Sequence, residues 1–252
     1  MSLFFTAVIF ILGLCIGSFL NVVILRLEKS ESIGGRSYCP HCKHPLTWFD
    51  LIPVFSFLFL GGKCRYCKAK ISWQYPMVEI GTAVIFLLIT NDQLPITNMA
   101  GLLNVLFLFY ISSSLIIIFV YDFYHYIIPD IVLFPAIIVA LPFHVSWNYL
   151  LAAMLASGFF LCIFFVSHGK WMGFGDVKLA VLLGLILGLP NILAALFLAF
   201  FFGAIIGVSL MLLNQKGLKS ELPFAPFLIL GTFMALFWGP EILNWYMGLF
   251  IV

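Results

Sequence analysis

Apolar stretches of about 20 residues recur along most of this chain, and they constrain its fold more than any other feature. Hydrophobic residues make up 64% of the sequence, and charged residues only 9%. Backbone polar groups in lipid must be paired within the chain, so stretches of this kind fold as α-helices. The sequence therefore predicts an all-α, polytopic membrane protein and excludes an ordinary soluble domain.

Hydropathy places about eight transmembrane helices on the chain. The predicted spans are Leu3–Leu25, Tyr75–Thr90, Met99–Tyr121, Ile128–Phe143, Tyr149–Val166, Val177–Leu189, Ile192–Leu213 and Phe224–Ile251. Eight spans put both termini on the same side of the membrane, and the connecting loops then alternate between the two sides.

The basic residues set the orientation of these spans. All 12 Lys and Arg fall in loops on one side: Arg26, Lys29, Arg36, Lys43, Lys63, Arg65, Lys68, Lys70, Lys170, Lys178, Lys216 and Lys219. The alternate loops, at 91–98, 144–148 and 190–191, contain neither residue type. By the positive-inside rule, we expect the basic loops to be cytoplasmic and both termini to face outward.

The long hydrophilic segment, residues 28–74, carries two CxxC pairs. Cys39 and Cys42 form the first pair, and Cys64 and Cys67 form the second after 21 intervening residues. This pattern is typical of a structural zinc site in which four thiolates complete a tetrahedral shell. A cytoplasmic loop keeps thiols reduced, which disfavours disulfides but leaves redox chemistry or unpaired thiols as alternatives.

Two aspartates flanked by apolar runs are the candidate catalytic residues. Asp122 follows a long apolar span, where the helix dipole disfavours an acid, so helix capping does not explain it. Asp176 follows Gly173 and Gly175 in a Gly-Phe-Gly-Asp motif. It can cap the next helix, but the glycines also permit a close backbone approach that capping does not require. Paired carboxylates can activate water for hydrolysis.

Other polar residues near the same membrane face have weaker interpretations. Asp130 opens the fourth predicted span, where an acid is ordinary, so we assign it a supporting role. Lys178 either extends to the interface or acts electrostatically on Asp176. Asn21, Arg26 and Glu79 form a polar group that either binds a ligand or links helices through hydrogen bonds.

The motifs together resemble the type IV prepilin peptidases, bacterial leader peptidases of the GxGD aspartic class. The resemblance is carried by Gly17-Ser18-Phe19-Leu20-Asn21-Val22-Val23, the two CxxC pairs, Ile52-Pro53, Ile71-Ser72-Trp73-Gln74-Tyr75-Pro76-Met77-Val78-Glu79, Asp122 with Pro129-Asp130, and Gly173-Phe174-Gly175-Asp176-Val177-Lys178. It extends from about residue 10 to residue 190 in the family's order.

The resemblance implies a bifunctional enzyme of the bacterial inner membrane. Such an enzyme cleaves the leader of prepilins and pseudopilins after a glycine at the cytoplasmic face, with Asp122 and Asp176 as the catalytic pair. It then N-methylates the new terminus with S-adenosylmethionine, and its four cysteines hold one Zn²⁺. The candidate methyl-donor region is Asn21, Arg26 and Glu79. The expected partners are pilin-like substrates and the lipid bilayer, with no nucleic acid.

The expected domains are a first transmembrane helix at 1–26, a cytoplasmic zinc-binding domain at 27–74, and a transmembrane GxGD protease domain at 75–252. A proton-coupled transporter that uses Asp122 and Asp176 as a relay is the alternative function. It would not need a four-cysteine module, whereas a zinc-dependent scaffold would leave both aspartates unexplained.

Overall fold

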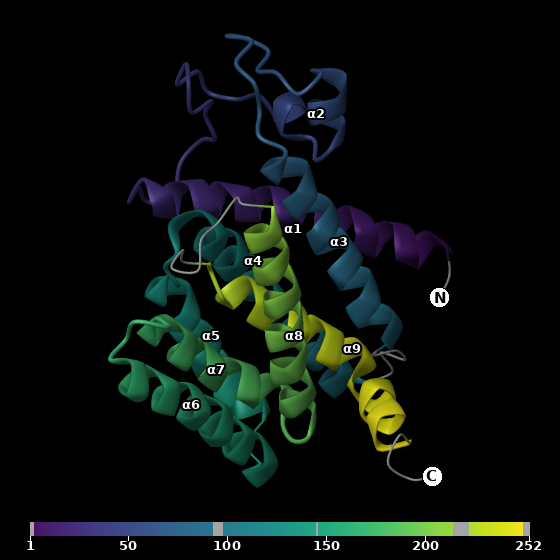
Figure 1. Ribbon diagram of the computed structural model, residues 1–252. Helices are drawn as coiled ribbons and strands as arrows, with labels where there is room; N and C mark the ends of the chain where they lie inside the picture. Colours follow the sequence, from purple (N-terminus) through teal and green to yellow (C-terminus); the bar gives the residue numbers. More distant parts are fainter. Residues whose placement is uncertain (1–2, 93–97, 145, 214–221, 249–252) are drawn as a thin grey trace. The chain divides into compact units, whose positions relative to one another are not determined.

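The computed structural model describes residues 3–92, 98–144, 146–213 and 222–248. Within these ranges the regular elements are helices, with two isolated β-bridges and no strand (Figure 1). The chain divides into two compact units, Met1–Ile117 and Ile118–Val252, and the boundary falls inside helix α4 (Met99–His125). The predicted domains at 1–26, 27–74 and 75–252 stay predictions.

The first unit is built on helices α1 (Leu3–Glu28) and α3 (Gln74–Asp92). Glycines of α1 bring the two backbones together: a Cβ on Gly13 would lie 2.4 Å from the Cα of Ala83, and one on Gly17 would lie 2.6 Å from the Cα of Glu79. Small residues allow this close packing where burial of apolar surface does not drive helix association. Phe86 of α3 also stacks on Phe109 of α4.

Between α1 and α3, residues 29–73 form a small module with little regular structure. It contains a 3₁₀ helix η1 (Trp48–Leu51), a short helix α2 (Phe55–Phe59), and bridges that pair Tyr38 with Pro45 and Lys63 with Lys70. With 4 and 5 residues, η1 and α2 are both too short to span a bilayer.

The second unit contains the end of α4 and five further helices. They are α5 (Asp130–Phe143), α6 (Trp147–Ser167), α7 (Phe174–Leu187), α8 (Asn191–Leu212) and α9 (Ala225–Gly248). Helix α7 is buried over most of its length and contacts α5, α6, α8 and α9. Helix α9 is kinked at Trp238, two residues before Pro240, as expected from the loss of a backbone donor.

Each of the eight predicted spans is a helix whose described bounds lie within a few residues of the prediction. Among the described residues, five helices are long and apolar enough to cross a membrane, namely α1, α4, α6, α8 and α9 over Ala225–Tyr246, whereas α3, α5 and α7 are not among them. The predicted number of eight is therefore not confirmed: α5 and α7 have 14 residues each, about 21 Å of helix against a core of about 30 Å. The predicted basic loop with Lys216 and Lys219 and the end of the last span lie outside the described residues.

Candidate functional site

The second unit brings Asp122 and Asp176 together. Asp122 lies in the last turn of α4 and Asp176 in the first turn of α7, with 5% and 8% of their surfaces exposed. The two carboxyl groups lie close enough for their charges to interact. The backbone N–H of Ala225, at the start of α9, faces the Asp122 carboxylate. The Oδ2 atom of Asp122 is buried and has no hydrogen-bond partner in the described chain. The arrangement is a pair of buried carboxyl groups, of which Asp122 has an acceptor oxygen without a partner in the described chain.

The local sequence explains why α4 ends just after Asp122. After Asp122, α4 continues only to His125, and Tyr126 adopts a left-handed conformation with φ +59° while its N–H bonds the carbonyl of Asp122 at 2.9 Å. Such a residue ends a helix by satisfying a free carbonyl. Pro129 then precedes α5 with extended φ and ψ. The turn therefore fixes Asp122 at the end of its helix.

The Gly-Phe-Gly-Asp motif forms the start of α7. Gly173 is the N-cap, with φ −74° and ψ 150°, and its carbonyl accepts the N–H of Asp176 at 3.2 Å. A Cβ on Gly175 would lie 3.2 Å from Ile128, so the expected close approach is found there. Neither glycine has a positive φ, so Gly175 is needed for space rather than for an unusual dihedral angle.

The supporting residues Lys178 and Asp130 pair with each other. Lys178 Nζ lies 2.7 Å from both carboxylate oxygens of Asp130 and also lies over the ring of Phe174, 5.6 Å from its centroid. The pair joins the first turns of α5 and α7. This contact positions the helix that carries Asp176, and the predicted electrostatic action of Lys178 on Asp176 stays a prediction.

In the first unit, the four predicted cysteines converge. Their Sγ atoms all lie within 4.8 Å of one another, and those of Cys39 and Cys67 are 3.9 Å apart. Tetrahedral Zn–S bonds of about 2.3 Å place sulfur atoms about 3.8 Å apart, so the cluster fits such an ion. The backbone N–H of Cys67 chiefly lowers the pKa of the Cys64 thiol, to about 7, which favours the thiolate that binds metal.

Both CxxC segments form the same knuckle, which was not recognised from the sequence. The N–H of Cys39 bonds the carbonyl of His44, and the N–H of Lys43 bonds the carbonyl of Cys39; Cys64, Ala69 and Lys68 repeat this pattern. Both lysines have a positive φ, of 58° and 61°. The sequence feature that could have revealed the knuckle is the repeated pattern Cys-x-x-Cys-Lys.

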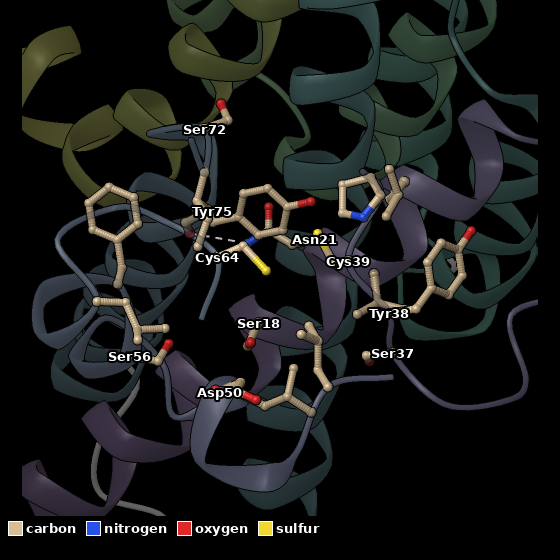
Figure 2. A pocket seen from close by; sticks show the side chains of 18 of the residues that line it. Ser18, Asn21, Ser37, Tyr38, Cys39, Asp50, Ser56, Cys64, Ser72 and Tyr75 are labelled. Carbon is tan, nitrogen blue, oxygen red and sulfur yellow. Dashed lines mark hydrogen bonds between the residues drawn. The ribbon is translucent and has the colours of Figure 1, made fainter. Parts of the chain in front are cut away.

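The predicted polar group Asn21, Arg26 and Glu79 is buried in the first unit and lines a cavity of about 320 Å³. Figure 2 shows Asn21 in the wall of this cavity. Asn21 Nδ2 donates to the carbonyl of Tyr75 at 3.1 Å. Glu79 Oε2 accepts the N–H of Val54 at 2.7 Å. Val54 itself has a positive φ of 61°, which is rare for a β-branched residue, and neither the contact nor the strain was visible from sequence.

Arg26 differs from the other two members of this group because both of its terminal NH2 groups donate to backbone carbonyls. Its guanidinium bonds the carbonyls of five successive residues, which are Ser32, Ile33, Gly34, Gly35 and Arg36. These bonds hold the start of the module on the end of α1, and a ligand-binding role for Arg26 stays a prediction.

The fold and these clusters define a class: a polytopic helical membrane protein with two buried aspartates at helix ends and a separate four-cysteine module. Comparison with known proteins gives the family. Residues 11–92 match the Bacterial Peptidase A24 N-terminal domain, and residues 108–208 match the Type IV leader peptidase family. The chain belongs to the type IV leader peptidases.

Relatives extend the similarity over nearly the whole chain. A prepilin leader peptidase/N-methyltransferase of Aeromonas salmonicida (strain A449) is 32% identical, covering 96% of this chain and 94% of that protein. One of Bacillus subtilis (strain 168) is 34% identical, with 95% and 97% covered, and one of Pseudomonas aeruginosa is 31% identical, with 94% and 91% covered. No solved structure matches significantly. Nothing in these comparisons supports the transporter alternative.

Proposed function

We propose that this protein cleaves the leader peptides of prepilins and pseudopilins after a glycine, with Asp122 and Asp176 as the catalytic pair. The observation that carries the proposal is the meeting of two buried carboxyl groups, from helix ends 54 residues apart in the sequence. Membership of the leader peptidase family supports the reaction class, and the names of the relatives support the substrate class.

The chemistry follows from the proximity of the two carboxyl groups. Like charges this close disfavour double ionisation, so the pair holds one proton. The ionised carboxylate removes a proton from water while the protonated carboxyl donates its proton to the scissile carbonyl oxygen. A tetrahedral diol results, and its collapse breaks the C–N bond as the leaving amine takes a proton from the pair. The buried setting strengthens each of these interactions by lowering the local dielectric constant.

The proposal includes an orientation in the membrane. The distribution of Lys and Arg supports a cytoplasmic position for the module and for the aspartate pair in a bacterial inner membrane. A substrate with an apolar helix after its cut site would then reach the pair laterally from the bilayer, with its basic leader on the cytoplasmic side.

Single substitutions test the catalytic pair. Asp122→Asn and Asp176→Asn should each abolish cleavage of a coexpressed prepilin, scored by its gel mobility, while the protein remains inserted and folded. Asp130→Asn is the matched control, because it removes an acid from the same region and should retain measurable activity. Substantial processing by either purified pair variant would refute the assignment.

Methylation of the new amino terminus is the second proposed activity, supported by the N-methyltransferase in the relatives' names. S-adenosylmethionine supplies an activated methyl group when bound. The cysteine cluster is not a source of methyl groups. We assign it a structural Zn²⁺, because four thiolates leave no open coordination position on the ion.

The zinc assignment has its own test. Cys39→Ser should lower the zinc content from about one ion per chain, and it should lower thermal stability. Elemental analysis of protein purified without chelators measures the zinc content. Cys15→Ser is the control, since Cys15 is an exposed cysteine of α1 outside the cluster. Absence of zinc from the wild-type protein would contradict the assignment.

A further inference from the structure

The cavity of the first unit is distinct from the aspartate pair and lies in the part of the chain that matches the N-terminal domain. It is lined by α1, the cysteine module and the start of α3, and its walls include Ser18, Asn21 and Tyr75 (Figure 2). A volume of about 320 Å³ falls in the range of small-molecule sites, roughly 300–1,000 Å³. The matched peptidase region, residues 108–208, contains both aspartates and none of these lining residues.

The cavity wall carries a buried acceptor without a donor. Both donors that Asn21 uses go to backbone carbonyls, those of Gly17 at 3.3 Å and Tyr75 at 3.1 Å. Its Oδ1 atom is buried and has no hydrogen-bond partner in the described chain. Buried polar atoms are almost always paired, so this oxygen indicates a donor supplied from the cavity.

The same wall carries a buried carboxylate without a counter-charge. Glu79 is 6% exposed, accepts the N–H of Val54, and has the hydroxyl of Ser18 within hydrogen-bonding reach. It makes no ion pair with any described residue. A buried charge is costly unless it is paired, and the neutral donors Val54 and Ser18 do not pair it.

Asp50, the other carboxylate of this cavity, has the cationic partner that Glu79 lacks in the described chain. Asp50 is ion-paired with Arg65 at 2.7 Å and accepts two hydrogen bonds from Thr47. Arg26, a cation of the wall, already donates to carbonyls through both terminal NH2 groups. Glu79 is therefore the lining carboxyl group that has no cationic partner in the described chain.

We propose that this cavity binds S-adenosylmethionine and that Glu79 holds one of its two cationic groups, the sulfonium or the α-ammonium. The inference rests on the proposed methyltransferase activity and assigns it a place apart from the aspartate pair. The ligand supplies both missing features: a positive charge for Glu79 and N–H or O–H donors for Asn21. Val54, strained and held by Glu79, ties the module to the same carboxylate.

Direct binding to the purified full-length protein tests the proposal. Glu79→Gln removes the charge but keeps an acceptor oxygen for Val54, and it should weaken binding of radiolabelled S-adenosylmethionine by about 10-fold or more. Glu28→Gln is the matched control: it removes an exposed carboxylate at the end of α1, outside the cavity, and should bind the donor as the wild type does. Zinc content and thermal unfolding report whether each variant is folded.

A second ligand identifies which cation is held. S-adenosylhomocysteine lacks the sulfonium but keeps the α-ammonium, so unchanged affinity of Glu79→Gln for it assigns the carboxylate to the sulfonium. An equal loss for both ligands assigns the carboxylate to the α-ammonium. Unchanged affinity for both ligands in a folded Glu79→Gln variant overturns the proposal, even if binding of a peptide amine is lost instead.

Ultraviolet cross-linking of labelled donor to the wild-type protein keeps the proposal testable if Glu79→Gln does not fold. The label should fall on residues 18–79, and label on residues 118–252 would overturn the assignment of the cavity. Prepilin cleavage by the same preparation separates the two proposals: a preparation that cleaves but binds no donor rejects this site while the peptidase assignment stands.

Discussion

The contact between α6 and α7 is so close that a single methyl group should disturb it. A Cβ on Gly184 would lie 2.3 Å from the Cα of Ala153, 2.4 Å from its N, and 2.7 Å from the carbonyl carbon of Ala152. Normal contacts between carbon atoms are about 3.5–4.0 Å, so Gly184→Ala must separate the helices by at least about 1.2 Å. Both partners are backbone, so no side-chain rotation can relieve the clash.

The net effect on stability follows from two opposing contributions. Overpacking costs about 1–3 kcal/mol, and a backbone clash belongs at the upper end of that range. Replacing glycine by alanine inside a helix returns about 1 kcal/mol. We therefore expect Gly184→Ala to lower the free energy of unfolding by about 2 kcal/mol, which reduces the folded-to-unfolded ratio roughly 30-fold.

Gly158→Ala on α6 is the matched control, because nothing lies within 4 Å of the added Cβ. It should leave stability unchanged or raise it by up to about 1 kcal/mol. Unfolding of both variants in one detergent, followed by fluorescence or circular dichroism, measures the difference. Since α7 carries Asp176, a shift of about 1 Å should also lower prepilin cleavage about 100-fold. A Gly184→Ala variant as stable and as active as Gly158→Ala would refute the close packing.

Further predictions concern three local contacts. Gly175→Ala should reduce cleavage more than Gly173→Ala in the same assay. The added Cβ at Gly175 would lie 3.2 Å from the side chain of Ile128, whereas one at Gly173 would have no atom closer than 3.9 Å. The reverse order would contradict the proposed spatial role of Gly175. Arg26→Lys should lower stability by several kcal/mol in chemical unfolding, because an ammonium has three donors and the guanidinium bonds five carbonyls; unchanged stability would refute the structural role. A double-mutant cycle on Lys178 and Asp130 should give a coupling of about 0.2–1 kcal/mol, since both groups are partly exposed; a much larger coupling would mean that the pair is desolvated.

Sequence alone determined the positions of the helices and the composition of the metal-binding cluster. Apolar runs must become helices in lipid, because backbone N–H and C=O groups without a hydrogen-bond partner are not tolerated there and a helix pairs them within the run. The expected helix ends are found as well: α4 stops three residues after Asp122, and α7 starts two residues before Asp176. The CxxC knuckle is a local turn, so its geometry is encoded within a few residues.

Tertiary structure decided which side chains are partners. Lys178 pairs with Asp130, 48 residues away. Arg26 donates to backbone carbonyls through both terminal NH2 groups, whereas the donors that Glu79 meets in the described chain are the neutral groups of Val54 and Ser18. Hydropathy and spacing specify elements, but a polar side chain takes the partner that packing brings within about 3 Å. Only the folded chain therefore shows that the predicted polar group divides into a structural arginine and a carboxylate facing a cavity.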